Sequence, residues 1–439
     1  MSFKRYPKYK ASGLEWLGDV PDGWLIERSD AHLSNSRTQL DPKDFKGQDV
    51  FHYSIPIVQE IGTGQIEDGT EIASSKQVIT KKVVLVSKLN PRKATICIAE
   101  PNSILTLCSP EFVALEPIKV KIEYLNYLAL TEAFRQSLES KVTSVTKSHQ
   151  RANPSDIYRF WNAWPSLVEQ TAIAEFLELE TAKISELVLV QQQLIEQLKE
   201  KRQAIISHVV TKGLNPHAPM KPSGTEWLDK VPEHWKVRRL KEVGVLKGGA
   251  GFPPDMQDVA DEELPFYKVG DLKASTDGRL MAAPEHTVSK EIALKLRAAI
   301  IPIGSILYAK IGAALSLNRR RVTFCNCCID NNMTAYTPQK KFIQTNWAFY
   351  WLSILDFGTF KNPGAVPSLS EGDQGVLPIL VPPLAEQIQI TDFLAKETGN
   401  IDELVAEAQK VIDLLHERRR ALISVAVTGQ IDVRHLAGV

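Results

Sequence analysis

The sequence predicts an α+β protein in which two mixed α/β domains are separated by two long helices that pair as an antiparallel coiled coil. Three observations support this prediction. A helical stretch is written twice, 217 residues apart, and a Trp-Leu motif opens each half of the chain. The blocks between the helices share the order of their apolar runs but hardly any residues. Such internal repetition predicts a pseudo-two-fold, circular arrangement.

The repeated stretch runs from Ser166 to Leu214 in its first copy. Residues shifted by 217 positions are identical at all the matched positions but one, where Gln203 stands against Arg420. The matched residues are Glu169-Gln170, Phe176-Leu177, Glu180-Thr181, Ile184, Leu187, Ile195, Leu198, Arg202-Gln203-Ala204 and Val210-Thr211, which recur as Glu386-Gln387, Phe393-Leu394, Glu397-Thr398, Ile401, Leu404, Ile412, Leu415, Arg419-Arg420-Ala421 and Val427-Thr428.

Both copies keep a seven-residue register, which places an apolar seam along one side of a long helix. In the first copy we expect one seam position at Leu177, Ile184, Gln191, Leu198 and Ile205, and the other at Glu180, Leu187, Leu194, Lys201 and His208. The corresponding positions of the second copy run from Leu394 to Leu422 and from Glu397 to Val425. A seam needs a partner helix, and we expect the other copy, running antiparallel. The alternative is two separate amphipathic helices, each lying on a globular core.

A second repeat opens each half of the chain. The segment Ser12 to Trp24 recurs as Ser223 to Trp235, with Trp-Leu and Val-Pro at matching places. The second copy follows the first helix, whereas the first copy begins the chain. If the halves are equivalent, the N-terminus lies near Thr428 and Gly429, and the molecule closes like a ring.

The two variable blocks read as strand-rich mixed structure broken by turns. We expect domains at residues 1–163 and 215–380, and the helices within 164–214 and 381–439. In the first block, strands are expected in Val50 to Ile57, Gln77 to Val86, Ala94 to Ile98 and Phe112 to Leu115, and one helix in Tyr124 to Leu138. In the second block, strands are expected in Pro265 to Val269, Ala298 to Ala309 and Val322 to Tyr336, and a helix in Thr345 to Leu355.

Composition narrows the class of protein. Basic and acidic residues balance at 52 each, so any surface for a polyanion has to be a local cluster. No stretch has the roughly 20 apolar residues that a membrane span needs, and we expect a cytoplasmic protein. Five cysteines, three of them at Cys325, Cys327 and Cys328, do not suit a disulfide framework. Paired Cys-x-x-Cys hooks are missing, which favours buried strand residues over a zinc site.

The residues at the helix starts allow two interpretations. Ser166 with Glu169 fits a capping box, and Pro382-Pro383 with Glu386 suits a first helical turn. The two glutamates are therefore at least as consistent with helix capping as with a functional role.

The chain resembles the specificity subunits of type I restriction-modification systems over nearly its whole length. The matching pieces are Gly13 to Trp24, Leu85 to Arg92, Ser109 to Phe112, Tyr267 to Leu272, Gly304 to Gly312, Val366 to Ser370 and the Pro-Pro-Leu-Ala-Glu-Gln at Pro382 to Gln387. At the first helix start Trp164-Pro165-Ser166 replaces the family's Pro-Pro pair.

The resemblance implies a DNA-specificity subunit without chemistry of its own. Two target-recognition domains would each read half of a split site in double-stranded DNA, and the helices would space them and dock two methyltransferase subunits. Those partners would bring S-adenosylmethionine, and motor-endonuclease subunits would bring ATP hydrolysis and Mg. The residues expected at the docking sites are Glu169, Gln170, Glu386 and Gln387.

The residues agree that catalysis is absent. No Asn-Pro-Pro-aromatic motif for amino-methylation and no Gly-x-x-x-x-Gly-Lys-Ser/Thr phosphate loop occurs in the sequence. Asp255 followed by Asp271 and Lys273 has the spacing of a nuclease carboxylate set, a pattern that is common by chance.

Local clusters provide candidate DNA contacts, because Arg and Lys suit phosphates and guanine edges whereas Asn and Gln suit adenine. The candidates are Lys88, Asn90, Arg92, Lys93, Lys147, His149, Gln150 and Arg151 in the first block and Lys268, Lys310, Asn318, Arg319, Arg320, Arg321 and Asn331 in the second. Basic loops are often merely solvated turns. The alternative function is therefore a coiled-coil scaffold protein without sequence-specific DNA binding.

Overall fold

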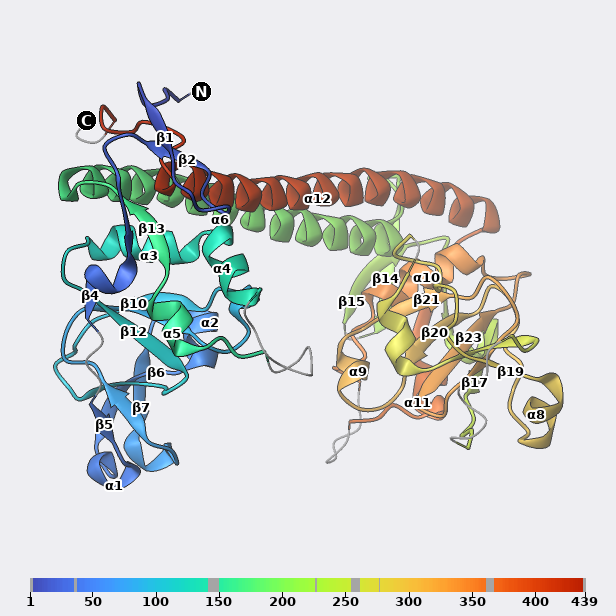
Figure 1. Ribbon diagram of the computed structural model, residues 1–439. Coiled ribbons are helices and arrows are strands. Elements are labelled where there is room, and N and C mark those ends of the chain that lie inside the picture. The colour runs from blue at the N-terminus through green and yellow to red at the C-terminus, as the bar shows by residue number, and fades with distance from the viewer. Residues whose placement is uncertain are drawn as a thin grey trace. The chain divides into compact units, whose positions relative to one another are not determined.

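The computed structural model describes residues 3–34, 38–140, 150–225, 227–253, 261–275, 277–360 and 367–436 (Figure 1). The chain divides into two compact units: unit 1 comprises residues 1–192 and 409–439, and unit 2 comprises residues 193–408. Each unit therefore contains one variable block together with a part of both long helices. The division cuts the two helices within one residue of corresponding positions in the 217-residue repeat.

The two repeated stretches are continuous helices, α6 (Leu167–Lys212) and α12 (Leu384–Val427), of 46 and 44 residues. The predicted cap at the start of α6 is present, since the Ser166 hydroxyl accepts a hydrogen bond from the Glu169 N–H at 3.3 Å. In unit 1, Arg419 donates to the Ser185 hydroxyl at 3.3 Å; in unit 2, Arg202 pairs with Asp402 at 2.9 Å. Partner numbers along α12 fall as α6 advances, which identifies an antiparallel pair.

One predicted seam position is confirmed and the other is wrong by one residue. Leu177 and Ile184 are buried, as expected. Leu187 and Leu194, however, are 49% and 40% exposed, and Leu404 and Val411 of the second copy likewise. The buried residues stand one position later, and they are Thr181, Val188, Ile195 and Val209 in α6 and Thr398, Ile412 and Ala426 in α12.

The error has a simple cause. Apolar residues stand side by side at both candidate positions, as in Leu187-Val188 and Leu194-Ile195. A spacing of three then four residues and a spacing of four then three give the same seven-residue period. Only the partner helix selects between them. The unselected residues remain exposed, and they are Leu187 and Leu194 on α6 and Leu404 and Val411 on α12.

The first block is built on two sheets, with its entry and exit strands β3 (Leu25–Arg28) and β13 (Trp161–Trp164) paired antiparallel. The four-stranded sheet has the order β10-β9-β12-β4 and is antiparallel throughout, with β10 at Ile96–Ala99, β9 at Val83–Ser87, β12 at Phe112–Pro117 and β4 at Leu33–Ser34. The five-stranded sheet has the order β5-β8-β11-β6-β7, with β5 at Gln39–Leu40, β8 at Lys76–Val78, β11 at Thr106–Cys108, β6 at Asp49–Tyr53 and β7 at Gln65–Asp68. The first block also contains the short helix α1 (Pro42–Phe45).

The second block repeats this topology. Its entry and exit strands β16 (Lys236–Arg239) and β24 (Pro378–Val381) pair with each other. The order β17-β23-β20-β21 matches β4-β12-β9-β10, with β17 at Gly244–Gly248, β23 at Met333–Pro338, β20 at Ile306–Ala309 and β21 at Arg320–Val322. The order β19-β18-β22 matches β7-β6-β11, including one parallel pair in each sheet, with β19 at Thr287–Val288, β18 at Leu264–Tyr267 and β22 at Cys328–Ile329. Its short helices include α7 (Leu240–Val243) and α8 (Lys290–Lys295).

The helices of the blocks correct two predictions. Tyr124 to Leu138 is two helices, α3 (Ile122–Leu130) and α4 (Glu132–Glu139), because Thr131 is extended and its hydroxyl caps the second. Ile55 to Ile57 begins α2 (Ile55–Ile61) instead of extending β6, since the Ser54 hydroxyl caps that helix. The predicted helix at Thr345 is confirmed as α10 (Thr345–Ile354).

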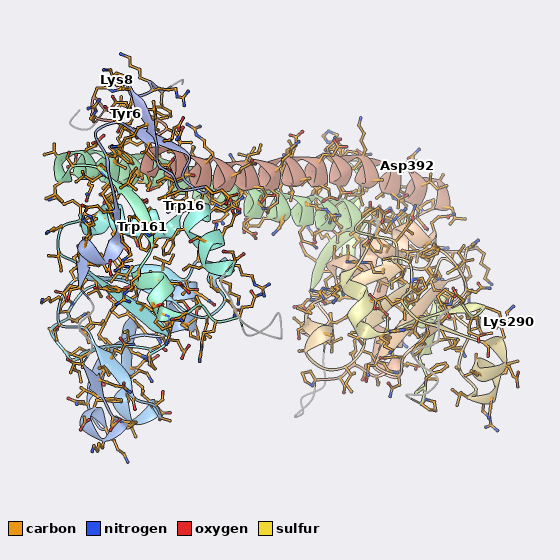
Figure 2. The ribbon with its side chains drawn as sticks, viewed as in Figure 1. Tyr6, Lys8, Trp16, Trp161, Lys290 and Asp392 are labelled. Atoms are coloured by element: carbon orange, nitrogen blue, oxygen red, sulfur yellow. The ribbon has the colours of Figure 1, made fainter. Side chains whose placement is uncertain are left out.

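Unit 1 brings the two ends of the chain together, as the ring prediction requires. The Tyr9 hydroxyl donates to the Gly429 carbonyl at 3.0 Å, and the Asp432 N–H donates to the Lys4 carbonyl at 2.8 Å. Tyr6 lies on this N-terminal segment, which runs through the hairpin of β1 (Tyr9–Ala11) and β2 (Asp19–Pro21) (Figure 2). Gly429 has a φ of 71° and lies so close to Trp24 that a Cβ there would be 2.9 Å from the ring.

Unit 2 contains the same junction at the end of α6. Gly213 has a φ of 77°, and a Cβ at this position would be 3.3 Å from the Trp235 ring. The neighbouring hairpin of β14 (Met220–Thr225) and β15 (Leu228–Pro232) is the counterpart of β1 and β2. In both units a left-handed glycine therefore lets the end of a long helix approach the Trp-Leu motif closely.

The remaining composition-based expectations concern cysteines and membrane spans. Cys97, Cys108, Cys327 and Cys328 are buried in or beside strands, and Cys325 is half-buried. Across the described residues, no helix combines the length and apolar character needed to cross a membrane.

Because the chain ends meet in unit 1, a circular permutant opened at the exposed His217, with the old ends joined by a linker, should fold with about the stability of the parent. The opened loop lies between α6 and β14 and contains no seam residue. Circular dichroism and thermal unfolding provide the measurements. A permutant with the same linker but opened after Ile195, inside the buried seam, is the control and should fail to fold. Misfolding of the His217 permutant would contradict the equivalence of the two halves.

Candidate nucleic-acid interface and helix junctions

Two buried glutamines join the long helices to the variable blocks. The Gln170 side-chain oxygen accepts a hydrogen bond from the Lys121 N–H at 2.8 Å, directly before α3. The Gln387 oxygen accepts one from the Gln344 N–H at 2.9 Å, directly before α10. The two glutamines are 1% and 0% exposed. Each therefore satisfies an unpaired N–H at the start of a block helix, which fixes that helix against the long one.

The neighbouring glutamates bind the ends of the Trp-Leu motifs. Glu169 accepts a hydrogen bond from the Trp24 indole N–H at 3.2 Å, and Glu386 lies 2.8 Å from His234 Nε2. The side chain of Glu169 thus does not complete the predicted capping box.

All four residues expected to dock partners are engaged within their own units, and the buried amides of the glutamines offer no surface to another chain. Direct docking through the glutamates stays a prediction.

The first block brings two distant candidate segments together at the end of β9. Asn90 is in the left-handed region, with a φ of 47°, and turns the chain after Lys88. Its N–H donates to the Gln150 carbonyl at 2.8 Å, and Leu89 forms an antiparallel bridge with Arg151. The structure therefore assembles one polar, basic loop pair from two segments about 60 residues apart in the sequence.

The charges of this loop pair are partly neutralised. Glu111 pairs with Arg151 at 2.8 Å and lies 4.0 Å from Lys88. Arg92 and Lys93 form an exposed turn, and the Arg92 carbonyl accepts a hydrogen bond from Arg135 of α4 at 3.1 Å.

Sequence reasoning missed Arg135, since α4 was expected as the end of a longer helix and gave no sign of reaching this turn. Lys147 and His149 lie outside the described residues.

The second block contains the same backbone pattern around Lys310, which follows β20 as Lys88 follows β9. The lysine N–H donates to the Glu111 carbonyl in the first block and to the Asn332 carbonyl in the second, at 2.9 Å in both. In each block the lysine carbonyl accepts a hydrogen bond from the segment that leads into a short helix, α5 (Pro154–Tyr158) or α11 (Glu371–Val376). The exposed Asn331 belongs to the neighbouring turn. Lys88 and Lys310 therefore occupy equivalent positions.

Arg320 was predicted to contact DNA, and the structure contradicts this. Its side chain is 3% exposed, and its guanidinium donates to the carbonyls of Asn318 and Leu355. The same group lies 4.3 Å from the centre of the Phe357 ring, a cation–π contact. Burial lowers the pKa of Arg320 to about 10, so the group remains charged at neutral pH. Arg320 is a structural residue, because strand alternation turns it inward.

The neighbours of Arg320 differ from it. Arg319 is exposed and Arg321 is half-buried, so both remain available for contacts. Asn318 adopts a φ of 51°, and its amide bonds Asp356 and the Phe357 N–H, which indicates a structural turn.

Lys268 lies half-buried at a helical turn, where its N–H donates to the Asp271 carboxylate at 2.7 Å. That bond gives Asp271 a structural role at a turn (η5, Val269–Lys273). Asp255 lies outside the described residues. Within the described ranges, no three His, Cys, Asp or Glu side chains are grouped so that they could hold a metal ion.

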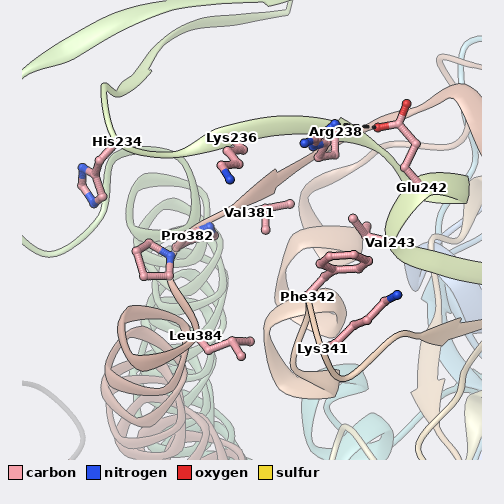
Figure 3. Close-up of a pocket in the computed structure, with 11 residues that line it drawn as sticks. His234, Lys236, Arg238, Glu242, Val243, Lys341, Phe342, Val381, Pro382 and Leu384 are labelled. Atoms are coloured by element: carbon pink, nitrogen blue, oxygen red, sulfur yellow. Dashed lines mark ion pairs between the residues drawn. The ribbon is translucent and has the colours of Figure 1, made fainter.

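A basic cavity of about 440 Å³ lies beside the start of α12. Lys236, Arg238 and Lys341 line it, and Arg238 pairs with Glu242 at 4.0 Å (Figure 3). These cations come from β16 and from the segment before α10, so their convergence depends on the tertiary structure and has no signal in the sequence.

Comparisons with known proteins converge on one family. A family model described as the type I restriction modification DNA specificity domain matches residues 232–412. The specificity subunit of the type I restriction enzyme EcoDI from Escherichia coli is 21% identical over 341 residues, which cover 72% of each chain. A solved chain, described under the complex assembly and conformational transition of the type I R-M system, has a TM-score of 0.72 and 18% identity. The match covers 93% of this chain and 98% of that one.

The two glutamines at residues 387 and 389 provide a matched test of the helix junction. Gln387→Ala should destabilise the protein by about 1–3 kcal/mol, because it leaves the Gln344 N–H buried and unpaired. Gln389→Ala, at an exposed position two residues further on, should change stability by less than about 0.5 kcal/mol. Urea denaturation measures both changes. Equal stability of the two variants, with weaker partner binding by Gln387→Ala alone, would instead support a docking role.

Proposed function

Since the chain belongs to the specificity subunits of type I restriction-modification systems, we propose that each variable block reads one half of a bipartite site in double-stranded DNA. The observation that supports this best is the combination of a common backbone with different side chains. Lys88 and Lys310 have matching hydrogen bonds, yet the residues around them differ. Two equivalent scaffolds with different surfaces suit two half-sites of different sequence.

The DNA contacts in this proposal come from the loops at the ends of the central strands. In the first block they comprise Lys88, Asn90, Arg92, Lys93, Gln150 and Arg151, with Lys147 and His149 as further predictions. In the second block, Lys268, Lys310 and Asn331 are the candidates for half-site contacts, whereas Arg319 and Arg321 are candidates for phosphate contacts only. Lys and Arg would contact phosphates and guanines, and Asn and Gln would contact adenines. The balanced global charge makes these clusters the source of DNA affinity.

The proposal assigns catalysis to partner subunits. Two methyltransferase subunits would bring S-adenosylmethionine, and motor-endonuclease subunits would bring ATP and Mg, whereas this chain would be non-catalytic. Leu187 and Leu194 of α6 and Leu404 and Val411 of α12 support docking along the helices, since exposed aliphatic residues suit a protein partner.

The competing function is a coiled-coil scaffold without sequence-specific DNA binding. A scaffold would bind partner proteins but show no salt-dependent preference for one DNA sequence. Methylation-site sequencing of cells that carry the chain with its methyltransferase distinguishes the two functions, because only a specificity subunit directs that methyltransferase to a split site.

Exchange of residues 236–380 for the equivalent block of a relative should change one half of the recognised site and leave the other intact. The reason is that β16 and β24 pair at the base of the block, so the block enters and leaves the frame at one place. Methylation-site sequencing reads both halves. The control exchanges the block for itself with synonymous codons. A change in both halves would contradict independent reading by the two blocks.

The helices should also determine the length of the unread spacer. Insertion of one heptad after Gln191 and another after Ala408 preserves the seam and lengthens each helix by about 10 Å. At roughly 3.4 Å per base pair, the preferred spacer should grow by about three pairs. That increase also rotates the second half-site by about a third of a turn, so affinity should fall.

Selection from DNA with randomised spacers measures the change. A heptad inserted into α6 alone is the control and should destabilise the protein, because it breaks the pairing with α12. An unchanged preferred spacer in a folded double-insertion variant would show that the helices do not measure distance.

A further inference from the structure

A second basic cleft in unit 2 lies where α6 meets the variable block. Two adjoining cavities, of about 440 and 190 Å³, share Arg202, Phe349 and Tyr350 in their walls. The walls come from α6, α10, α12, β21 and the turn at residues 277–279. We refer to these joined cavities as the arginine cleft.

The arginine cleft carries an excess of positive charge. Five arginines and three aspartates line it, with no lysine, histidine or glutamate. Arg202 pairs with Asp402 at 2.9 Å, and Arg279 donates to Asn346 at 2.8 Å. Within the described part of the chain, Arg319 forms no ion pair. The aspartates therefore neutralise only part of the positive charge of the cleft, and the remaining charge attracts anions.

The backbone holds two of these cations in place. The buried Arg320 bonds the Leu355 carbonyl and so anchors the start of β21, which directs Arg319 and Arg321 outward on either side. The Arg321 Nε–H is buried without a partner. Burial, and then the nearby charge of Arg319, lower the pKa of Arg321. An exposed and a half-buried guanidinium group are thus near each other, an arrangement that an anion would stabilise.

We propose that the arginine cleft binds a backbone phosphate of the unread spacer DNA, an inference that rests on the proposed function. Guanidinium forks match phosphate oxygens, and a phosphate contact needs no particular base. Arg202 lies ten residues before the end of α6, about 15 Å along the helix towards its middle. The cleft therefore lies against the helix to which the proposed function assigns the length of the spacer.

The test uses the chain assembled with its methyltransferase and a duplex that carries the site found by methylation sequencing. Arg319→Gln should reduce the slope of log affinity against log salt by about 0.9, because one phosphate contact is lost. When salt is raised from 50 to 200 mM, the affinity of Arg319→Gln for DNA should therefore fall by a factor about three- to fourfold smaller than that of the parent. The methylated sequence should not change. Arg202→Gln should act in the same direction, and thermal melting confirms that each variant folds.

The matched control is Lys199→Gln, which removes one positive charge from the exposed side of α6, where Lys199 pairs with Glu196 at 2.8 Å. It should keep the salt dependence of the parent. An equal change in the Lys199→Gln and Arg319→Gln proteins would reduce the effect to general charge and overturn the proposal.

Neutral methylphosphonate linkages, placed one at a time in the spacer, locate the contact. One or two positions should weaken binding by the parent and by Lys199→Gln, yet have no further effect on Arg319→Gln. Sensitivity confined to the half-sites would overturn the proposal. So would calorimetric binding of inorganic phosphate or ATP that Arg319→Gln abolishes while DNA binding stays unchanged. If the parent shows no site-specific DNA binding, the proposed function is wrong. If the parent binds its site and the variants have the same affinity and salt dependence as the parent, only the assignment of the arginine cleft is wrong.

Discussion

The burial of one apolar seam is the constraint on which the rest of this structure depends. Two helices of more than forty residues present rows of aliphatic side chains that water would solvate poorly, and pairing removes one row from each. The pairing also determines where the helix ends lie. Each end then needs partners for its unpaired backbone groups, and the Trp-Leu motifs and variable blocks supply neighbouring structure at those ends.

The junctions explain why short motifs recur although the blocks diverge. A Glu-Gln pair at each helix start performs two tasks, since the glutamate binds the Trp-Leu motif and the glutamine binds the first turn of a block helix. These bonds involve backbone groups or residues of the motifs. Substitutions elsewhere in a block leave them intact, which allows the surface loops to differ without loss of the frame.

The basic residues separate into two physical classes. The charge of the Arg320 guanidinium is stabilised inside the block, by buried carbonyls and an aromatic ring. Arg319 and Arg321 flank Arg320 in the sequence but differ from it in surroundings, because alternate strand residues face opposite sides. Charge alone therefore does not identify a nucleic-acid contact; the charged group must also be exposed.

The sequence by itself determined the frame of this protein. The repeat, the period of the helices, the closure of the chain ends and the strand-rich character of the blocks all follow from local pattern and order. The tertiary structure decided which apolar row is buried, since Leu187 and Val188 are equally suitable until a partner helix selects one. It also decided that Thr131 divides a helix and that Arg202, Arg319 and Arg321 share one cleft. These outcomes depend on contacts between residues distant in sequence, which local hydrophobic period and composition do not encode.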